Sequence, residues 1–288
     1  MDMHIKKTDS KFPWLYLLLA YGLAWLWFIP VALTRQDYKS SPVLLLAVFV
    51  GVFGPGLAGI ILTYRDRDPE KRRDFWRRAT DFRRIRLGWI VFMLLLWPAL
   101  HLLSNILSKA LGSAPPVSEM VQSLAAQPLL IPAIVVLYFI QAGLEDLGWR
   151  GYMLERTLQS WSPVKAALLV GIFHALWHLP LFWVVGTNQI KMGIGFDFLL
   201  FVAQAVSFSI YATWCYVDNR HSTLAAILLH TVGNLCNDVF TLPGGTMKFQ
   251  LYTLFMVAGA FVISLVWLRR SGRLEGSAAR NEAVFAKR

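Results

Sequence analysis

Apolar runs separated by short polar segments dominate the pattern of this chain. Crossing the roughly 30 Å hydrocarbon core of a bilayer takes about 20 helical residues, and eight runs come close to or reach that length. They fall at about Trp14–Leu33, Pro42–Thr63, Trp89–Leu107, Leu129–Trp149, Lys165–Val185, Phe196–Val217, Thr223–Phe240 and Leu251–Leu268. The pattern therefore predicts an all-α polytopic membrane protein with about eight transmembrane helices.

The composition supports a membrane protein. Hydrophobic residues make up 56% of the chain and the mean hydropathy is +0.50, which is more apolar than a soluble domain of this length. The net charge of +11 is spread between the apolar runs rather than gathered in one patch, which argues against a nucleic-acid partner. Cys215 and Cys236 both lie inside apolar runs and have no metal-ligand spacing, so we expect buried side chains and no disulfide.

The lysine and arginine residues predict the orientation in the membrane. With the N-terminus inside, 23 of them fall on the inner side and 5 on the outer side. Cytoplasmic segments carry the excess of positive charge, so both termini are expected to be cytoplasmic. We divide the chain into a cytoplasmic N-terminus (1–13), one transmembrane helical domain (14–268, with a core at about 129–240) and a polar cytoplasmic tail (269–288).

Two of the connecting segments also give expectations. In the basic loop from Arg65 to Arg86, Phe75, Ala79 and Phe82 recur at helical spacing, which suggests a helix lying on the inner membrane surface. A solvated basic loop held by anionic lipid fits the same residues equally well. The outer loop from Lys109 to Gln127 is polar, and we expect it to be irregular.

The stretch QAGLEDLGWRGYML holds the first candidate functional residues. The apolar run before it, Leu129–Leu144, has only 16 residues, so a helix that begins there carries Glu145 and Asp146 into the membrane. Acidic residues at that depth are costly and mark a functional site by default. Asp146 and Arg150 are four residues apart and can form an ion pair along the helix, whereas Glu145 points elsewhere.

Two later runs carry further polar residues. His174 and His178 are four apart in the fifth run, and His230 and Asn234 are four apart in the seventh. Each of these residues alone fits a hydrogen-bonded packing role. Together with Glu145 they must turn inward to avoid lipid. An acid, imidazoles and an amide in one cavity can supply a base, its orienting partner and donors to an oxyanion.

In the seventh run, Asn237 and Asp238 continue the stripe that begins at His230 and Asn234. Pro180 follows His178 and is expected to bend or loosen the fifth helix there. The first, third and eighth runs carry fewer polar residues, and we expect them to serve as scaffold.

Three motifs in this order resemble those of a known family. The segments EDLGWR, HALWH and HTVGN are similar to the E-E-x-x-x-R, F-x-x-x-H and H-x-x-x-N/D motifs of the CPBP intramembrane proteases. That family includes the type II CAAX prenyl endopeptidases and the Abi or bacteriocin-immunity proteins. The resemblance covers roughly Leu129 to Asn237. Asp146 replaces the second glutamate of the first motif, and His174 replaces the aromatic residue of the second.

The resemblance implies an intramembrane endopeptidase that hydrolyses a peptide bond of a membrane-associated or lipidated protein. Glu145 would activate water together with His178, and His230 and Asn234 would donate to the oxyanion. Asp146, Arg150 and His174 would support them. We expect no cofactor; if the enzyme depends on zinc, the ligands would come from His174, His178, Glu145 and His230.

The resemblance also implies a multi-pass protein of the bacterial inner (cell) membrane, whose partners are the bilayer and a peptide or protein substrate. Two other functions fit the same residues. One is a membrane immunity or scaffold protein of the same family that binds a partner without catalysis. The other is a proton-coupled transporter that uses Glu145 and the histidines as a relay.

Overall fold

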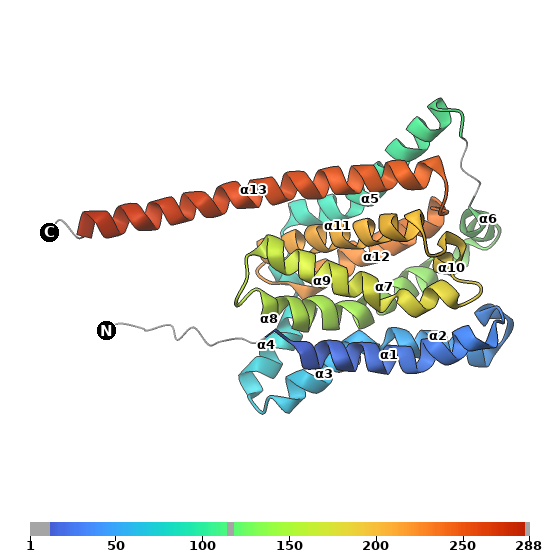
Figure 1. Ribbon diagram of the computed structural model, residues 1–288, viewed down its shortest axis with the longest axis horizontal. Helices are drawn as coiled ribbons and strands as arrows, with labels where there is room; N and C mark the ends of the chain where they lie inside the picture. The colour runs from blue at the N-terminus through green and yellow to red at the C-terminus, as the bar shows by residue number, and fades with distance from the viewer. Residues whose placement is uncertain (1–11, 114–117, 286–288) are drawn as a thin grey trace.

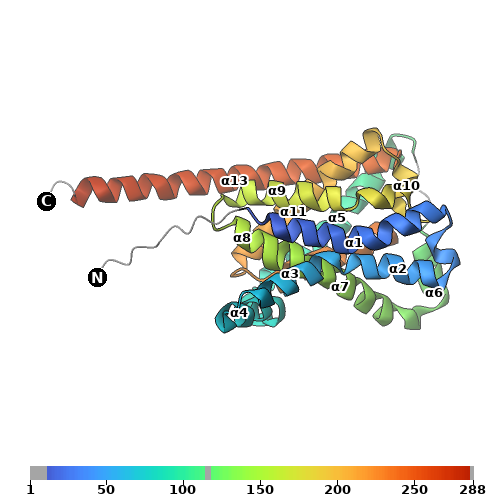
Figure 2. The same ribbon diagram turned by 60° about the horizontal axis from the view of Figure 1, so that its bottom comes forward.

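The computed structural model describes residues 12–113 and 118–285, and within those residues it contains helices and no strands. The predicted all-α class is therefore confirmed. The long helices run side by side in one bundle (Figures 1 and 2). In both views α4 (Pro69–Thr80) lies at one end of the bundle, and α6 (Glu119–Ala126) lies at the opposite end.

Six helical segments of the described chain are long and apolar enough to cross a membrane, as predicted for an integral membrane protein. They are Trp14–Thr34 (α1), Leu87–Ala110 (α5), Pro128–Thr157 (containing α7, Ile131–Gly148), Pro163–Trp183 (containing α9, Pro163–Trp177), Phe196–Asp218 (α11) and Met247–Arg269 (the first part of α13). The second predicted span is instead two helices, α2 (Pro42–Val52) and α3 (Gly54–Arg65), bent by 44° at Phe53. Counting that pair as one span gives up to seven.

The remaining predicted span is α12, Thr223–Val239, which is shorter than expected. Its 17 residues measure about 26 Å, less than the roughly 30 Å of hydrocarbon. It packs against α5, α7 and α11, so its neighbours cover it on several sides. All eight apolar runs are therefore helical, whereas the number of full crossings stays a prediction.

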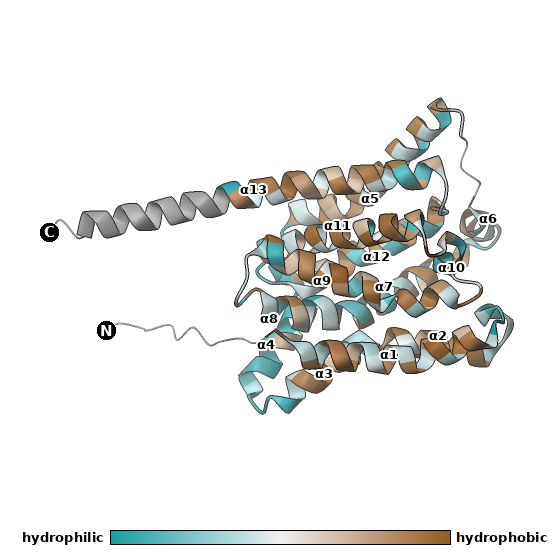
Figure 3. Ribbon diagram, viewed as in Figure 1, coloured by the Kyte–Doolittle hydropathy of each residue, from teal (hydrophilic) through white to brown (hydrophobic). Residues whose placement is uncertain are grey.

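The basic segment between α3 and α5 forms a helix rather than a loop. It begins at Asp68, whose carboxylate accepts the amide N–H of Glu70, and it buries Phe75 and Ala79 against the bundle. Figure 3 shows the hydrophilic colour of α4 beside the more apolar spans. The expected third apolar residue, Phe82, lies beyond the helix in a 3₁₀ turn and is 70% exposed, so the stripe is shorter than predicted.

Two polar segments are more regular than expected. Part of the outer loop forms α6, where the Ser118 hydroxyl accepts the N–H of Val121 at the start of the helix, so the expectation of an irregular loop is wrong there. The helix α13, Met247–Phe285, continues well past the predicted end of the last span at Leu268. Figure 1 shows its second half leaving the bundle.

Two clusters of buried apolar side chains build the core. One joins α1, α3 and α9 with the segment that follows α7, and it includes Phe28, Trp149 and Trp177. The other joins α5, α11, α12 and α13, and it includes Trp97 and Tyr211. Because α7 packs against both α3 and α12, the end of α7 lies where polar side chains from both halves can meet.

Candidate active site

The acidic pair lies at the end of α7, where the helix changes its geometry. After Gly148 the chain widens into a π-helical turn, Trp149–Leu154. Gly148 allows α3 to approach closely, since a Cβ atom there would stand 2.1 Å from the carbonyl oxygen of Pro55. Such π-turns are rare and are frequent at functional sites. In this chain the turn holds Arg150 beside the acids.

Asp146 connects two elements of the bundle. Arg150 Nη1 donates to Asp146 Oδ1 at 2.6 Å, and neither side chain is exposed, so the ion pair predicted from the helical spacing is present. The other oxygen, Oδ2, lies 3.2 Å from His230 Nδ1 on α12. Sequence reasoning missed this second contact, through which Asp146 orients His230. The Arg150 guanidinium also lies 4.6 Å from the ring centroid of Phe208.

Glu145 faces the opposite way, towards α9. Its Oε2 atom lies 3.0 Å from His174 Nε2, and both side chains are buried. His178 Nδ1 donates to the carbonyl oxygen of His174 at 2.9 Å, which leaves Nε2 of a neutral His178 as an acceptor. One possible ligand atom from each of these three residues lies within 4.8 Å of the other two.

The end of α9 is held by side chains of α1. The α-helix stops at Trp177, His178 is its C-cap, and a 3₁₀ turn containing Pro180 follows. Tyr21 donates to the carbonyl of Phe173 at 2.6 Å, and Trp25 donates to the carbonyl of Trp177 at 2.9 Å. Because helix-end carbonyls lack partners inside their own helix, these bonds fix the turn that carries both histidines. The first span is therefore more than scaffold.

The third wall of the site is α12. His230 is buried, and its ring centroid lies 6.1 Å from that of His174 and 4.8 Å from that of Phe208. Asn234, one turn further along, is half-buried and has no hydrogen-bond partner among the residues that the structure describes. The amide of Asn234 is thus available to a ligand.

The rest of the predicted polar stripe points to a different cluster. Asn237 Oδ1 lies 3.2 Å from Nε2 of His101, and the Tyr138 hydroxyl donates to the Asp238 carboxylate. His101 is fully buried on α5, in the span that was expected to be scaffold. A lone histidine inside an apolar run was the available signal for it.

The geometry allows two kinds of chemistry. Glu145 and His178 can hold a water molecule between a carboxylate and an imidazole, with His230 and Asn234 on the neighbouring helix as hydrogen-bond donors. Alternatively, Glu145, His174 and His178 provide a two-histidine, one-carboxylate donor set of the kind that holds catalytic zinc.

Comparisons with known proteins agree with the resemblance seen in the motifs. The model of the family "Type II CAAX prenyl endopeptidase Rce1-like" matches residues 127–236, a range that contains all three motifs. The chain is also 29% identical to CAAX prenyl protease 2 of Methanococcus maripaludis over 257 residues, which cover 87% of this chain and 93% of that protein. The resemblance predicted from the motifs is therefore confirmed: this all-α membrane protein is similar to the Rce1-like type II CAAX prenyl endopeptidases.

Proposed function

We propose that this protein is an intramembrane endopeptidase of the glutamate type, which hydrolyses a peptide bond of a membrane-associated or lipidated protein. The observation that carries the proposal is that two adjacent buried acids contact different partners. Asp146 is held by Arg150 and His230, whereas the side-chain hydrogen-bond contact of Glu145 within the described chain is with His174 of α9. A carboxylate placed beside imidazoles suits proton transfer.

In the proposed reaction Glu145 accepts a proton from a water molecule that His178 Nε2 helps to hold. The water oxygen attacks the carbonyl carbon of the scissile peptide bond and the carbonyl oxygen becomes an oxyanion. With both ring nitrogens protonated, His230 donates through Nδ1 to Asp146 and through Nε2 to that oxyanion. The Asn234 amide donates a second hydrogen bond to the oxyanion. The C–N bond then breaks, and the proton on Glu145 passes to the leaving amine, so one water molecule is consumed.

The supporting residues orient these groups. Asp146 occupies His230 Nδ1, which directs Nε2 away from α7 and towards the substrate. His174 holds Glu145 through their 3.0 Å contact. Burial of the site strengthens each of these interactions, because electrostatic attraction is larger where water is excluded. Preorganised donors of this kind typically contribute about 10²–10³ in rate each.

We favour a mechanism without metal. The related motif carries an aromatic residue where this chain has His174, so the third donor of a zinc set is a departure of this sequence rather than part of the motif. The relative's name and the position of the site inside the membrane helices support a lipidated or membrane-inserted peptide segment as the substrate. A scaffold function without catalysis is the second candidate, because the Arg150–Asp146–His230 arrangement also stabilises the fold.

The test is cleavage of a panel of lipidated and unmodified peptides by the purified protein in lipid. We expect Glu145→Gln to lower turnover by about 10²–10⁴, as removal of a general base does. Glu119→Gln is the matched control, since this exposed acid lies at the opposite end of the bundle. A chelator should leave activity unchanged, and metal analysis should find no stoichiometric zinc.

Wild-type turnover by folded Glu145→Gln would contradict the glutamate mechanism. Activity that a chelator abolishes and zinc restores would favour the zinc set instead. A folded wild-type protein that cleaves none of the peptides would favour the scaffold function.

A further inference from the structure

Arg78 of the surface helix α4 is buried beneath the candidate active site, although it belongs to the basic loop between two spans. Only 5% of it is exposed, whereas its neighbour Arg77 on the same helix is exposed. Burying a guanidinium is costly unless it is paired and hydrogen-bonded. Asp74 of the same helix supplies one ion pair, and the other contacts that offset this cost reach Gly151, Glu155 and Tyr216 below the site.

The first contact reaches the π-helical turn. Arg78 Nη1 donates to the carbonyl oxygen of Gly151 at 3.0 Å, one residue after Arg150. Gly151 also lies directly against α4, because a Cβ atom there would stand 3.2 Å from the ring of Phe75. A π-turn is rarely adopted inside an α-helix, so an outside donor at this carbonyl helps to select it.

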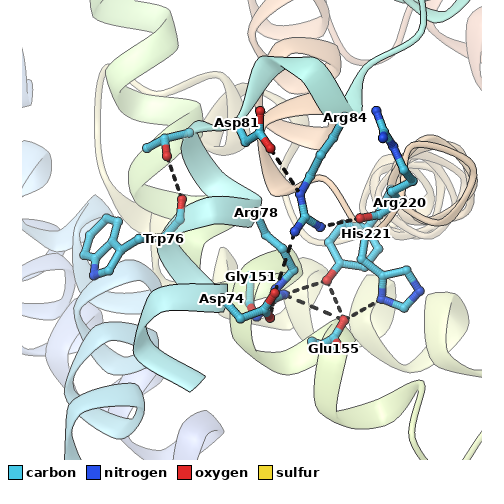
Figure 4. A network of polar contacts seen from close by, with 11 residues as sticks. Asp74, Trp76, Arg78, Asp81, Arg84, Gly151, Glu155, Arg220 and His221 are labelled. Atoms are coloured by element: carbon cyan, nitrogen blue, oxygen red, sulfur yellow. Dashed lines mark hydrogen bonds and ion pairs between the residues drawn. The ribbon is translucent and has the colours of Figure 1, made fainter. Parts of the chain in front are cut away.

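The second set of contacts reaches the turn that starts α12. Arg78 Nη1 also donates to the Tyr216 hydroxyl at 2.6 Å, and that hydroxyl donates to Glu155 Oε2 at 2.6 Å. The same Glu155 oxygen lies 2.8 Å from His221 Nδ1 and 3.7 Å from Arg78 Nη1. Figure 4 shows Arg78, Glu155 and His221 converging beside Gly151.

That turn needs such support. Arg220 and His221 both have positive φ, 55° and 58°, a conformation that is unfavourable for residues other than glycine. Arg84 Nη1 donates to the Arg220 carbonyl at 2.5 Å, and Arg84 also lies 3.7 Å from Asp74, whose other oxygen accepts from Arg78. The strained turn is thus held by the same network, and the helix that begins just after it carries His230.

We propose that Arg78 is a positioning residue for the candidate active site. It touches none of the reacting groups. Through Gly151 it fixes the turn that carries Arg150, and through Tyr216 and Glu155 it fixes the start of α12. Arg78 thereby sets the relative placement of Asp146, on α7 just before the π-helical turn, and His230, on α12. This inference rests on the proposed function for its kinetic part only.

The test compares Arg78→Gln with Arg77→Gln, the same substitution at the exposed neighbour. We expect Arg78→Gln to lower kcat by about 10- to 100-fold, since a misplacement of about 1 Å costs that much, while KM stays within about twofold. Arg78→Lys keeps the positive charge but has one donor nitrogen in place of the three of the guanidinium. It should therefore recover part of the lost kcat. Arg77→Gln should behave as wild type.

Amide hydrogen exchange supplies a readout that does not depend on activity. In Arg78→Gln, exchange should become faster in residues 149–155 and 219–226 and stay unchanged elsewhere. Tyr216→Phe, which removes one hydroxyl, should speed exchange in 219–226 alone. This variant replaces Arg78→Gln in the test if Arg78→Gln does not fold.

Wild-type kcat in Arg78→Gln would overturn the proposal. Faster exchange throughout the bundle, with kcat and KM changed together, would show a merely structural role and would also overturn it. If the wild-type protein cleaves nothing, the proposed function fails, and the exchange pattern still decides whether Arg78 fixes these two segments.

Discussion

Asp146 is fully buried and contacts two side chains from different parts of the chain, Arg150 and His230. Asp146→Asn keeps the size of the side chain but leaves the Arg150 charge buried without a counter-charge. Breaking a buried pair in this way typically costs about 3–5 kcal/mol. We therefore expect the free energy of unfolding to fall by about that amount, measured by denaturation of the purified protein in detergent.

The control for that prediction removes both charges. Asp146→Asn combined with Arg150→Met replaces the uncompensated guanidinium with an apolar side chain of similar length, which should recover much of the lost stability. If the double variant is less stable than Asp146→Asn alone, the cost does not come from the unpaired Arg150 charge.

Spacing along one helix was enough to predict the Asp146–Arg150 pair, because residues four apart on a helix are neighbours. The contacts of Asp146 with His230 and of Glu145 with His174 join positions 84 and 29 residues apart. Those contacts depend on how three helices pack, so the sequence indicated that the residues converge but not which ones touch. The sequence also could not show that Asn237 belongs to a different cluster from Asn234. Its partner, His101, lies on a span that carried no other signal of a functional site.

Glycines set the spacing between α3 and α7. Gly148 stands opposite the Pro55 carbonyl, and a Cβ atom on Gly56 would stand 2.2 Å from the Leu144 carbonyl oxygen. Gly143 also lies on α7, but a Cβ atom there would meet nothing within 4 Å, so Gly143 is not part of this contact. Small residues of this kind let helix backbones approach closely in membranes.

Gly148→Ala should therefore force α3 and α7 apart. We expect a loss of stability of about 1–3 kcal/mol, as for overpacked cores, together with lower activity because the π-helical turn follows directly. Gly143→Ala is the matched control and should be neutral or slightly stabilising, since alanine favours helix over glycine by up to about 1 kcal/mol. Thermal unfolding in detergent and peptide cleavage measure both. Equal effects of the two substitutions would contradict the close-approach explanation.

Helix positions followed from hydrophobic runs, whereas local departures from the α-helix did not. The low helix propensity of Gly148 and Gly151 marked the end of α7 as irregular, but a π-turn differs from an α-turn by one residue and is selected by outside contacts such as that from Arg78. The bend between α2 and α3 is different, because it falls just before Gly54 and Pro55, residues that break helices, so the sequence carried a signal for it.

At the scale of the whole molecule, the two ends of the bundle differ in charge. The basic helix α4 and the network around Arg78 lie at one end, and α6 and α10 (Asn188–Met192) lie at the other (Figures 1 and 2). Glu145 is near the end that carries α4, because the π-helical turn after it contacts Arg78. If positive charge marks the cytoplasmic side, the candidate active site lies closer to the cytoplasm than to the outer surface.

Single cysteines labelled from each side of the membrane test this orientation. Thr80 at the end of α4 and Gln36 after α1 are both exposed and lie in segments predicted to be on opposite sides. An impermeant maleimide should label Gln36→Cys in intact cells, and Thr80→Cys only in inverted vesicles. The native Cys215 and Cys236 are 0% and 6% exposed, so their background should be low. The reverse pattern would place Glu145 towards the outer side, and substrates would then have to reach it from there.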